Sequence, residues 1–434
     1  MNISFRKLSL KMNIYIESYG CSASQNEGEI ISGLLKKAGF EIVENEKTAN
    51  LIILVTCYVK TPTEHRILDR IGKLQKNYPD KKLVISGCMP EGIYWKLNRI
   101  APGASMVSTH HVKKIIEVVK KTLEGKKVEF LGKSEEVKVC LPKIRKNPLI
   151  DIVPISSGCN SSCSYCCVRI AKGKLFSYPK EKIIEEIKDS VNSGCKEIWI
   201  TSQDNASYDN GKLPELMNDI TQIPGKFLVR IGMMNPNNVL PILPKLINAY
   251  KSEKIYKFLH LPVQSGDNEI LKKMNRNYKV TDFEKIVSQF NKELKYQLWT
   301  DAIVGFPGET EEQFKNTVEL IERIKPDWVN VSKYGARPNT PASKLEQLDT
   351  KVINNRSQVL SEIARKLSLE NNNKWVGWEG EVLISKKGNK ENQWFGRNFA
   401  YKHVLVEDKD NILGKFLKLR VLKAEPSYLF AEAV

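Results

Sequence analysis

The sequence predicts an α/β protein made of an N-terminal doubly wound parallel sheet, a central partial (β/α) barrel and a small C-terminal β-barrel. Two observations predict this architecture. From residue 13 to residue 345, apolar β-branched runs alternate with amphipathic helical stretches, a pattern typical of parallel sheets. After residue 374 the period changes to short alternating strands separated by turn residues, which is typical of an all-β module.

The N-terminal sheet domain is expected over residues 12–124. It contains three apolar runs that each stop at a cysteine: residues 13–21 at Cys21, 50–57 at Cys57 and 82–88 at Cys88. Helical patterns between the runs indicate that the strands are parallel. Because the carboxyl ends of parallel strands lie along one edge of a sheet, we expect the three cysteines to face one another at that edge, where open α/β sheets bind ligands.

Two flanking segments carry weaker signals. Residues 125–148 are charged and lack a long hydrophobic period, so we interpret them as a linker with a hairpin-like piece in which the isolated Cys140 packs. The segment before Met12 is short and polar, which does not fit a secretory signal peptide, and Met12 is an alternative start.

A partial TIM-type barrel is expected over residues 149–345. Its six candidate strands are residues 149–159, 197–205, 227–234, 256–266, 298–308 and 328–341. Chemistry in such barrels lies at the carboxyl ends of the strands. Those ends carry a cysteine loop and several polar residues, namely Gln203, Asp204, Arg230, His260, Gln264, Asp301 and Arg337. We interpret His260 as a hydrogen-bonded histidine of the barrel interior.

The last two segments complete the domain organisation. A long helical pattern makes residues 346–373 a connecting helix. Residues 374–434 are expected to form a five-stranded barrel similar in style to an OB fold. Aromatic residues occur in this module together with the basic residues Arg397 and Lys402. We expect about half of the aromatic residues to fill its core; they are Trp394, Phe395, Phe399 and Tyr401.

The cysteine loop of the barrel carries the strongest chemical signal. Cys159, Cys163 and Cys166 form a C-x3-C-x2-C pattern, which suits an iron–sulfur cluster with one iron left open. Zinc is the alternative, but zinc sites usually pair two C-x2-C groups, and Cys167 is adjacent to Cys166 and placed to chelate poorly. We therefore leave Cys167 outside the ligand set. Cys195 precedes a strand and is expected to pack in the core.

Composition points to a polyanionic partner. The formal net charge is +18, which favours nucleic acid through counterion release over the alternative of a generally lysine-rich composition. No apolar run reaches the ~18 residues that a membrane span needs. We expect a cytoplasmic monomer. In a reducing compartment the nine cysteines indicate metal or thiol chemistry rather than a disulfide framework.

The cysteine loop, which follows the first barrel strand, resembles the signature of the radical S-adenosylmethionine superfamily. Tyr165, directly before the last cysteine of the pattern, matches that family's aromatic position. The resemblance implies that Cys159, Cys163 and Cys166 hold a [4Fe–4S] cluster whose open iron binds S-adenosylmethionine. We nominate Tyr165, Gln203, Arg230, Gln264 and Arg337 for contact with S-adenosylmethionine or substrate.

Nearly the whole chain, from Met12 to Val434, resembles the methylthiotransferase family. The similar stretches include "YGCSASQNEGEIISGLLKKAGF", "HLPVQSGDNEILKKMNRNY" and "DAIVGFPGETEEQF", and the C-terminal module resembles a TRAM domain. The resemblance implies that Cys21, Cys57 and Cys88 hold a second [4Fe–4S] cluster, which carries the sulfur of the methylthio group.

The stretches "YGCSASQNEGE" and "KGKLFSYP" look like the archaeal and eukaryotic branch of that family. This branch adds a methylthio group to C2 of N6-threonylcarbamoyladenosine at position 37 of tRNA, next to the anticodon. The basic charge and the aromatic residues of the C-terminal module fit a partner grasped by phosphate contacts and stacking. The sequence leaves the sulfur donor and the electron donor open.

Two alternatives remain at this point. The first is a methylthiotransferase that modifies an aspartate of a ribosomal protein, and the second is an iron–sulfur RNA-binding protein without catalysis. The basic C-terminal module argues against the first alternative, because a basic protein target would favour acidic contacts.

Overall fold

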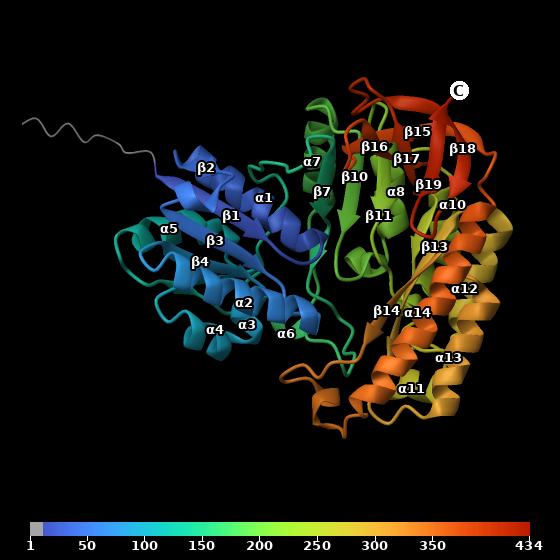
Figure 1. Cartoon of the computed structure of the whole chain (residues 1–434), viewed down its shortest axis with the longest axis horizontal. Helices are drawn as coiled ribbons and strands as arrows, with labels where there is room; N and C mark the ends of the chain where they lie inside the picture. Colours follow the sequence, from blue (N-terminus) through green and yellow to red (C-terminus); the bar gives the residue numbers. More distant parts are fainter. Residues whose placement is uncertain (1–11) are drawn as a thin grey trace, which may run out of the picture. The chain divides into compact units, whose positions relative to one another are not determined.

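The computed structural model describes residues 12–434, so the segment before Met12 lies outside the described residues (Figure 1). The chain divides into two compact units. Unit 1 comprises the residues up to Lys146 together with Ile170–Gly173, and unit 2 comprises Asn147–Arg169 together with Lys174–Val434. Within residues 12–434, none of the helices combines the length and the apolar character that crossing a membrane requires.

Unit 1 is built around a six-stranded parallel sheet with the strand order β2-β1-β3-β4-β5-β6. The strands are β1 Asn13–Ser18, β2 Glu41–Val43, β3 Leu51–Thr56, β4 Lys82–Gly87, β5 Ser105–Ser108 and β6 Glu129–Phe130. The β3 strand is buried along its whole length, as expected for an apolar central strand of a parallel sheet.

The helices of unit 1 connect these parallel strands. They are α1 Ser22–Lys37, η1 Glu46–Thr48, α2 Thr61–Asn77, α3 Met89–Gly92, α4 Tyr94–Ile100, η2 Val112–Lys114 and α5 Ile115–Leu123. Apolar residues of α1 and α5 pack with residues of the central strands in one buried core, to which Ile30, Ile53 and Val118 belong. The expected parallel sheet is therefore confirmed.

The hairpin-like piece expected within residues 125–148 is wrong. The segment instead supplies β6, which runs parallel to β5 at the edge of the sheet. The expected packing of Cys140 is also wrong, because Cys140 lies exposed in a turn with φ 61. Charged residues hid the edge strand, since an edge strand of two residues leaves almost no hydrophobic pattern.

Unit 2 contains six parallel barrel strands in two three-stranded sheets, ordered β11-β10-β7 and β12-β13-β14. The strands are β7 Ile150–Pro154, β10 Glu197–Thr201, β11 Leu228–Ile231, β12 Phe258–His260, β13 Gln297–Val304 and β14 Trp328–Lys333. A bridge between Val229 and Ile255 links the two sheets. The strands follow chain order, as expected for a partial barrel.

Helices lie between the barrel strands and after the last of them. They are α7 Lys180–Asn192, η3 Asn205–Asn210, α8 Leu213–Thr221, α9 Pro236–Val239, η4 Leu240–Ile242, α10 Leu243–Tyr250, α11 Asn268–Lys273, α12 Val280–Glu293, α13 Glu311–Ile324, η5 Pro341–Lys344 and α14 Thr350–Asn373. A short antiparallel pair, β8 Ser156–Ser157 with β9 Phe176–Ser177, flanks the cysteine loop. The helix α6, Val168–Lys172, crosses the boundary between the residues assigned to the two units.

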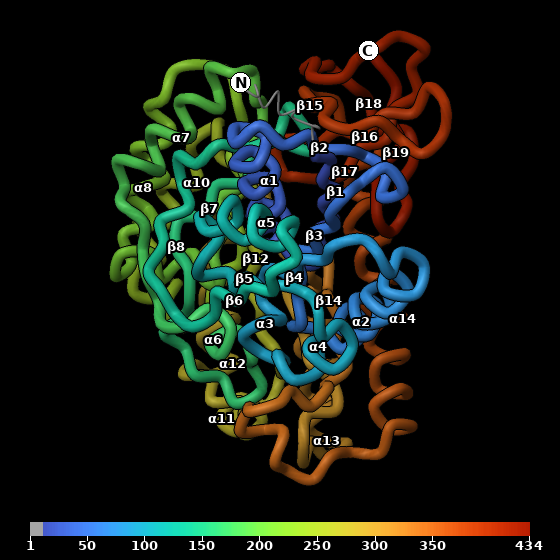
Figure 2. The backbone as a smooth tube through the Cα atoms, turned by 90° about the vertical axis from the view of Figure 1, so that its left-hand side faces the viewer, coloured from blue at the N-terminus to red at the C-terminus, as the bar shows by residue number. Residues whose placement is uncertain are grey.

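The C-terminal module, residues 374–434, closes into a five-stranded barrel ordered β15-β16-β17-β19-β18. Its strands are β15 Glu379–Lys387, β16 Gln393–Asn398, β17 His403–Glu407, β18 Phe416–Ala424 and β19 Leu429–Ala433. Within unit 2, Figures 1 and 2 place this module at one end and α11 at the other.

The C-terminal module is bonded to the starts of the barrel strands. Arg397 pairs with Glu197, the first residue of β10, at 3.1 Å, and Lys402 pairs with Asp327, directly before β14, at 2.7 Å. The Lys257 N–H, directly before β12, donates to the Phe399 carbonyl at 2.8 Å. The module therefore covers the amino ends of the strands and leaves their carboxyl ends, where barrel chemistry is expected, uncovered by it.

Candidate functional site

Three cysteines lie at the carboxyl ends of three neighbouring strands of unit 1. Cys21 follows β1, Cys57 follows β3 and Cys88 follows β4, and these strands are adjacent in the sheet. The Cys88 N–H donates to the Thr56 carbonyl at 2.9 Å, which fixes the start of Cys88 against the end of β3. The expected common edge for the three cysteines is therefore observed.

Glycines allow the backbone to approach at this edge. Gly20 has φ 108, and a Cβ atom there would lie 2.4 Å from Cβ of Cys57. Gly87 has φ 93, and a Cβ atom there would lie 2.4 Å from the Thr56 carbonyl oxygen. Both positions require glycine for conformation and for space, so the residues before Cys21 and Cys88 are restricted to glycine.

The thiols at this edge differ in exposure. Cys57 and Cys88 are buried, whereas Cys21 is exposed and its Sγ lies 3.7 Å from Oγ of Ser24. Burial raises the pKa of the Cys88 thiol well above its usual range. A metal centre that binds Cys88 as a thiolate must therefore displace a proton.

The second cysteine site lies in unit 2, in the loop after β8. This loop is bonded to the chain that follows β12: the Ser164 N–H donates to the Met274 carbonyl at 2.9 Å, and Nδ2 of Asn275 donates to the Ser162 carbonyl at 2.8 Å. The Ala342 N–H, in the segment after β14, donates to the Ser164 carbonyl at 2.9 Å. The cysteine loop is thus held at the carboxyl ends of the barrel strands.

Two N–H donors approach the sulfurs of this loop. The Ser161 N–H donates to Sγ of Cys159 at 3.4 Å, and Nη1 of Arg276 donates to Sγ of Cys163 at 3.5 Å. Burial raises the pKa of Cys159, and burial followed by the charges of neighbouring thiolates raises the pKa of Cys166 to about 12.

Arg276 was missed by the sequence reasoning. Its Nη2 donates to the Pro262 carbonyl at 3.2 Å and its Nε to the Tyr278 hydroxyl at 3.1 Å, so the guanidinium is fixed on three sides. The signal was present in the stretch "MNRNY", where an arginine stands between polar residues directly after α11.

Each site offers three cysteine thiols, the soft donors that iron–sulfur clusters prefer. Within the described part of the chain, no three His, Cys, Asp or Glu side chains converge as ligands of one ion. Thiols that also receive N–H hydrogen bonds are the donor set that holds such clusters and sets their potentials.

Tyr165 lies within this loop, whereas Gln203 and Gln264 follow the barrel strands β10 and β12. Tyr165 is half-buried against the apolar cluster that contains Met274 and Phe306. Gln203 follows β10, and its Oε1 is buried without a hydrogen-bond partner among residues 12–434. Gln264 has φ 70, an uncommon conformation for a residue other than glycine and one that concentrates at functional sites. Their contact with S-adenosylmethionine stays a prediction.

Arg230 and Arg337 occupy different surroundings. The Arg230 guanidinium lies over the rings of Phe258 at 5.2 Å and Trp199 at 5.5 Å, and over Tyr401 of the C-terminal module at 5.6 Å. These contacts turn Arg230 toward the amino ends of the strands. Arg337 is buried in the segment after β14. Their cofactor contacts also stay predictions.

Other strand-end residues have structural partners. Nε2 of His260 and Oδ2 of Asp301 lie 2.8 Å apart, which confirms His260 as a hydrogen-bonded residue of the barrel interior. Asp204 caps η3 and accepts the Asn235 N–H at 3.0 Å. Cys195 is fully buried before β10, so its expected place in the core is confirmed.

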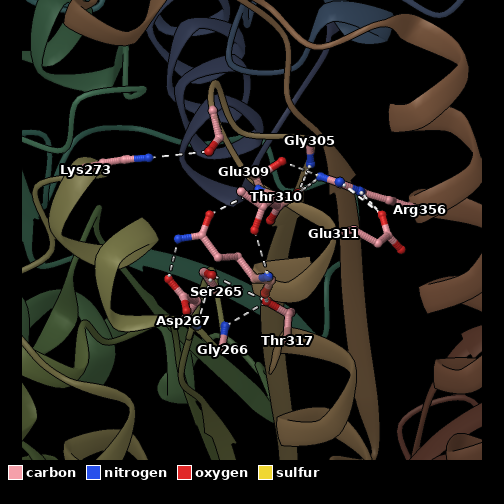
Figure 3. A network of polar contacts seen from close by, with 12 residues as sticks. Ser265, Gly266, Asp267, Lys273, Gly305, Glu309, Thr310, Glu311, Thr317 and Arg356 are labelled. Atoms are coloured by element: carbon pink, nitrogen blue, oxygen red, sulfur yellow. Dashed lines mark hydrogen bonds and ion pairs between the residues drawn. The ribbon is translucent and has the colours of Figure 1, made fainter. Parts of the chain in front are cut away.

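A buried ion pair fixes the loop between β13 and α13 (Figure 3). Nη1 of Arg356, on α14, lies 2.8 Å from Oε2 of Glu309, and the same carboxylate oxygen accepts the Gly305 N–H at 2.8 Å. Thr310 then caps α13 in a capping box with Gln313. The neighbouring loop after β12 is bonded to α13, since the Gly266 N–H donates to Oγ1 of Thr317 at 2.9 Å.

About half of the aromatic residues fill the core of the C-terminal module, as expected: Trp394 and Tyr401 are buried, whereas Phe395 and Phe399 are half-buried. The expected phosphate contacts of Arg397 and Lys402 are wrong, because both side chains are committed to the ion pairs that attach the module to the barrel. The sequence pattern of aromatic and basic residues is the same on every face of a small barrel. Which face remains exposed depends on how the C-terminal module packs against the larger barrel. Exposed lysines instead occupy the end of β15 and the turn after it: Lys386, Lys387 and Lys390.

Three family models match consecutive parts of the chain. They are described as "Uncharacterized protein family UPF0004" for residues 13–109, "Radical SAM superfamily" for residues 153–321 and "TRAM domain" for residues 374–434. The first range contains Cys21, Cys57 and Cys88, and the second contains the cysteine loop of the barrel.

Curated relatives match over nearly the full length. The chain is 41% identical over 425 residues to the "Probable threonylcarbamoyladenosine tRNA methylthiotransferase" of Methanothermobacter thermautotrophicus, covering 97% of this chain and 99% of that protein. It is 42% identical over 430 residues to the protein of the same name from Pyrococcus horikoshii, covering 98% and 100%. The human "Threonylcarbamoyladenosine tRNA methylthiotransferase" is 33% identical over 433 residues, covering 97% and 74%.

Solved structures share the fold at low identity. The radical S-adenosylmethionine methyltransferase TsrM from Kitasatospora setae, solved with cobalamin and a [4Fe-4S] cluster, gives a TM-score of 0.59 at 13% identity, covering 77% of this chain and 74% of that chain. The cobalamin-dependent radical enzyme OxsB gives 0.53 at 13% identity, covering 82% and 56%. These likenesses support the α/β fold alone.

Proposed function

The chain belongs to the threonylcarbamoyladenosine tRNA methylthiotransferases, and we propose that it replaces the hydrogen on C2 of N6-threonylcarbamoyladenosine, the tRNA nucleotide just 3′ of the anticodon, with a methylthio group. The observation that carries the proposal is the extent of the relationship. It spans practically the whole of both chains at about two-fifths identity, and a radical SAM domain lies within it.

The proposal assigns a cluster to each cysteine site. Cys159, Cys163 and Cys166 would hold the [4Fe–4S] cluster that the radical SAM family implies, and Cys21, Cys57 and Cys88 would hold a second one. Together with S-adenosylmethionine, these groups supply the carbon-centred radical, the methyl group and the sulfur chemistry that the exchange at C2 needs.

The protein's own part is to hold and orient these groups. Arg276 and the Ser161 N–H donate to sulfurs of the barrel site, and the Arg356–Glu309 pair fixes the loop that borders the same end of the barrel. Gln203 and Gln264 offer polar contacts at that end, and Gln203 has a buried oxygen that a bound ligand would satisfy.

The RNA-binding part of the proposal rests on the C-terminal module, which matches a TRAM domain. Lys386 and Lys387 are exposed, and Phe395 is half-buried and lies opposite Lys386 in the strand register. Ammonium groups beside an accessible ring suit phosphate contacts and base stacking in an unstacked anticodon loop.

We propose a monomer that acts in the cytoplasm on the anticodon loop of tRNA, with an electron donor and a sulfur donor of unassigned identity. The names of the relatives favour neither alternative, the modification of a ribosomal protein aspartate or RNA binding without catalysis.

Two measurements test the proposal. Anaerobic reconstitution of the full chain should load about eight irons, and about four after replacement of either set of three cysteines by alanine. Mass spectrometry of tRNA nucleosides from a deletion strain should lose 2-methylthio-N6-threonylcarbamoyladenosine, and the wild-type gene should restore it while neither triple variant does. Unchanged nucleosides in the deletion strain would eliminate the tRNA reaction.

A further inference from the structure

A buried charge network lies beside the three-cysteine edge of unit 1, and the proposed function leaves it unused. Its members are Glu27 on α1, Thr109 after β5, Lys138, and Lys172 at the end of α6. All four belong to unit 1, because residues 170–173 are assigned to it. The side chains of Glu27, Lys138 and Lys172 are 3%, 5% and 5% exposed, which is rare for charged groups.

One carboxylate oxygen serves both lysines. Nζ of Lys138 lies 2.6 Å and Nζ of Lys172 lies 3.2 Å from Oε1 of Glu27. The Thr109 hydroxyl donates to the same oxygen and accepts from Lys138 at 2.9 Å and from Lys172 at 3.1 Å. Oε2 of Glu27 is buried without a hydrogen-bond partner among the residues that the structure describes.

The network is attached to the backbone at the cysteine edge. The Thr109 N–H donates at 3.0 Å to the carbonyl of Gly87, the residue directly before Cys88. Glu27 lies on α1, the helix that begins directly after Cys21. Nε2 of His110 lies 2.8 Å from the carbonyl oxygen of Ala171, and this contact fixes the residue directly before Lys172. Lys172 is therefore joined through Thr109 to the backbone directly before Cys88.

The electrostatics agree with this placement. Burial alone would lower the pKa of Lys172, but the Glu27 carboxylate and the thiolates of Cys88 and Cys21 raise it above its usual range. Burial alone would raise the pKa of Glu27, but the two ammonium groups hold it at about 2. The Lys172 ammonium is thus held by Glu27 and Thr109 in a site that is almost closed to solvent.

In the hydrogen-bonded network, two ammonium groups share one carboxylate oxygen. A further carboxyl, that of Glu136, acts on Lys138. An ammonium group buried beside the cysteines is costly unless an anion compensates it, and Lys172 shares the Glu27 carboxylate with Lys138. Lys172 has three N–H donors, of which two are directed to Glu27 and Thr109.

We propose that Lys172, fixed by Glu27 and Thr109, holds an anionic sulfur ligand, a hydrosulfide or a methanethiolate, at the three-cysteine site of unit 1. The proposal rests on the proposed function, because three thiolates leave one iron of a cubane cluster open to such a ligand. The third N–H of Lys172 supplies a charge-assisted hydrogen bond to the sulfur anion, and Glu27 keeps the ammonium from turning away.

The test uses the full chain with Cys159→Ala, Cys163→Ala and Cys166→Ala, so that one cluster can load. After anaerobic reconstitution, sodium hydrosulfide and sodium methanethiolate are titrated against the reduced cluster and followed by electron paramagnetic resonance. Lys172→Met should weaken binding of both probes by about tenfold or more, the loss expected for one charge-assisted hydrogen bond. Lys172→Arg should bind within about threefold of the parent.

Two further variants separate charge from folding. Lys172→Gln keeps a donor but removes the charge, and it should bind the probes as weakly as Lys172→Met. Lys133→Met is the matched control, because Lys133 is an exposed lysine whose side chain borders Gly173. It should bind like the parent. Circular dichroism and iron content confirm that each variant folds and loads.

The outcomes distinguish this inference from the proposed function. If the parent fails to load about four irons, the second cluster of the proposed function is lost. If the parent loads but binds neither probe, or if loaded Lys172→Met and Lys172→Gln both bind as tightly as the parent, the role of Lys172 is overturned. If Lys172→Met does not fold, the comparison of Lys172→Gln with Lys172→Arg decides.

Discussion

Nη1 of Arg276 donates a hydrogen bond to Sγ of Cys163 at 3.5 Å, so a fixed cation lies against one of the three sulfurs of the barrel site. Hydrogen bonds to cysteine sulfurs and local charge are the main protein contributions to the potential of an iron–sulfur cluster. Arg276 is therefore placed to make reduction of a cluster at this site easier.

We expect Arg276→Met to lower the midpoint potential of the barrel cluster by roughly 50–100 mV, because the reduced cluster loses a hydrogen bond and a nearby positive charge. A redox titration followed by electron paramagnetic resonance measures this shift. The full chain should carry Cys21→Ala, Cys57→Ala and Cys88→Ala, so that a single cluster contributes to the signal.

Two variants control this measurement. Arg276→Lys keeps the charge and should fall between Arg276→Met and the parent. Arg323→Met removes an exposed arginine of α13 and should leave the potential unchanged. Equal potentials for Arg276→Met and Arg323→Met would show that the contact with Cys163 does not tune the cluster.

The Arg356–Glu309 pair gives a prediction about stability. Arg356→Met should lower the free energy of unfolding by about 3–5 kcal/mol, because it leaves the Glu309 carboxylate buried without its cation. Urea unfolding measures the change. Adding Glu309→Gln should recover part of the loss, whereas Arg323→Met, which breaks an exposed pair with Glu284, should cost about 1 kcal/mol or less. If Arg356→Met lowers the free energy of unfolding no more than Arg323→Met does, the Arg356–Glu309 pair does not stabilise the fold as proposed.

The exposed lysines of the C-terminal module give a prediction about RNA binding. Lys386→Glu combined with Lys387→Glu should weaken tRNA binding, and the slope of log affinity against log salt should fall by about 2, roughly one unit for each lost phosphate contact. Filter binding at several salt concentrations measures both effects. The matched control, Lys285→Glu with Lys292→Glu, makes the same change in net charge on exposed positions of α12. An equal loss in the control would mean that binding follows net charge alone.

His403 gives a prediction about pH. Burial, together with the charges of Arg397 and Lys386, lowers the pKa of His403 to about 4. Because the folded pKa lies below the unfolded value, the folded state binds fewer protons in this range. The contribution of His403 to stability is complete above pH ~6.5 and is lost as the pH falls toward 4, up to about 3 kcal/mol in total.

His403→Phe should therefore flatten the dependence of unfolding free energy on pH between about 6.5 and 4. Denaturant unfolding followed by tryptophan fluorescence is suitable, since the ring of Trp299 lies 6.5 Å from that of His403. His65→Phe changes an exposed histidine of α2 and should keep the parent's pH dependence. A parental slope in His403→Phe would mean that this histidine is not the group that titrates.

Much of the fold was predictable because it depends on local patterns. The alternation of apolar runs and helices predicted the parallel sheet of unit 1 and the parallel barrel strands of unit 2, and the three strand-end cysteines predicted a shared edge in unit 1. In a parallel sheet the ends of strands must meet, so sequence position alone carries spatial information for Cys21, Cys57 and Cys88.

The remaining features depend on contacts that are distant in sequence. Lys172 joins Glu27 across 145 positions, and Arg276 joins Cys163 across 113. The sequence around Lys172 or Arg276 does not distinguish either residue from an ordinary exposed lysine or arginine. The same limit explains the error over Arg397 and Lys402, since only the docking of the C-terminal module shows that both are consumed by ion pairs with the barrel.

The attachment of the C-terminal module to the amino ends of the barrel strands has a consequence for substrate choice. The cysteine loop lies at the other ends, and β13, with eight residues, alone measures about 26 Å along its axis. A nucleic acid that contacts both the C-terminal module and the cysteine loop must be long enough to span that distance and must be folded before it binds. The enzyme would then select a folded RNA arm by its length. A free nucleoside would contact the C-terminal module or the cysteine loop but not both, and would be held weakly.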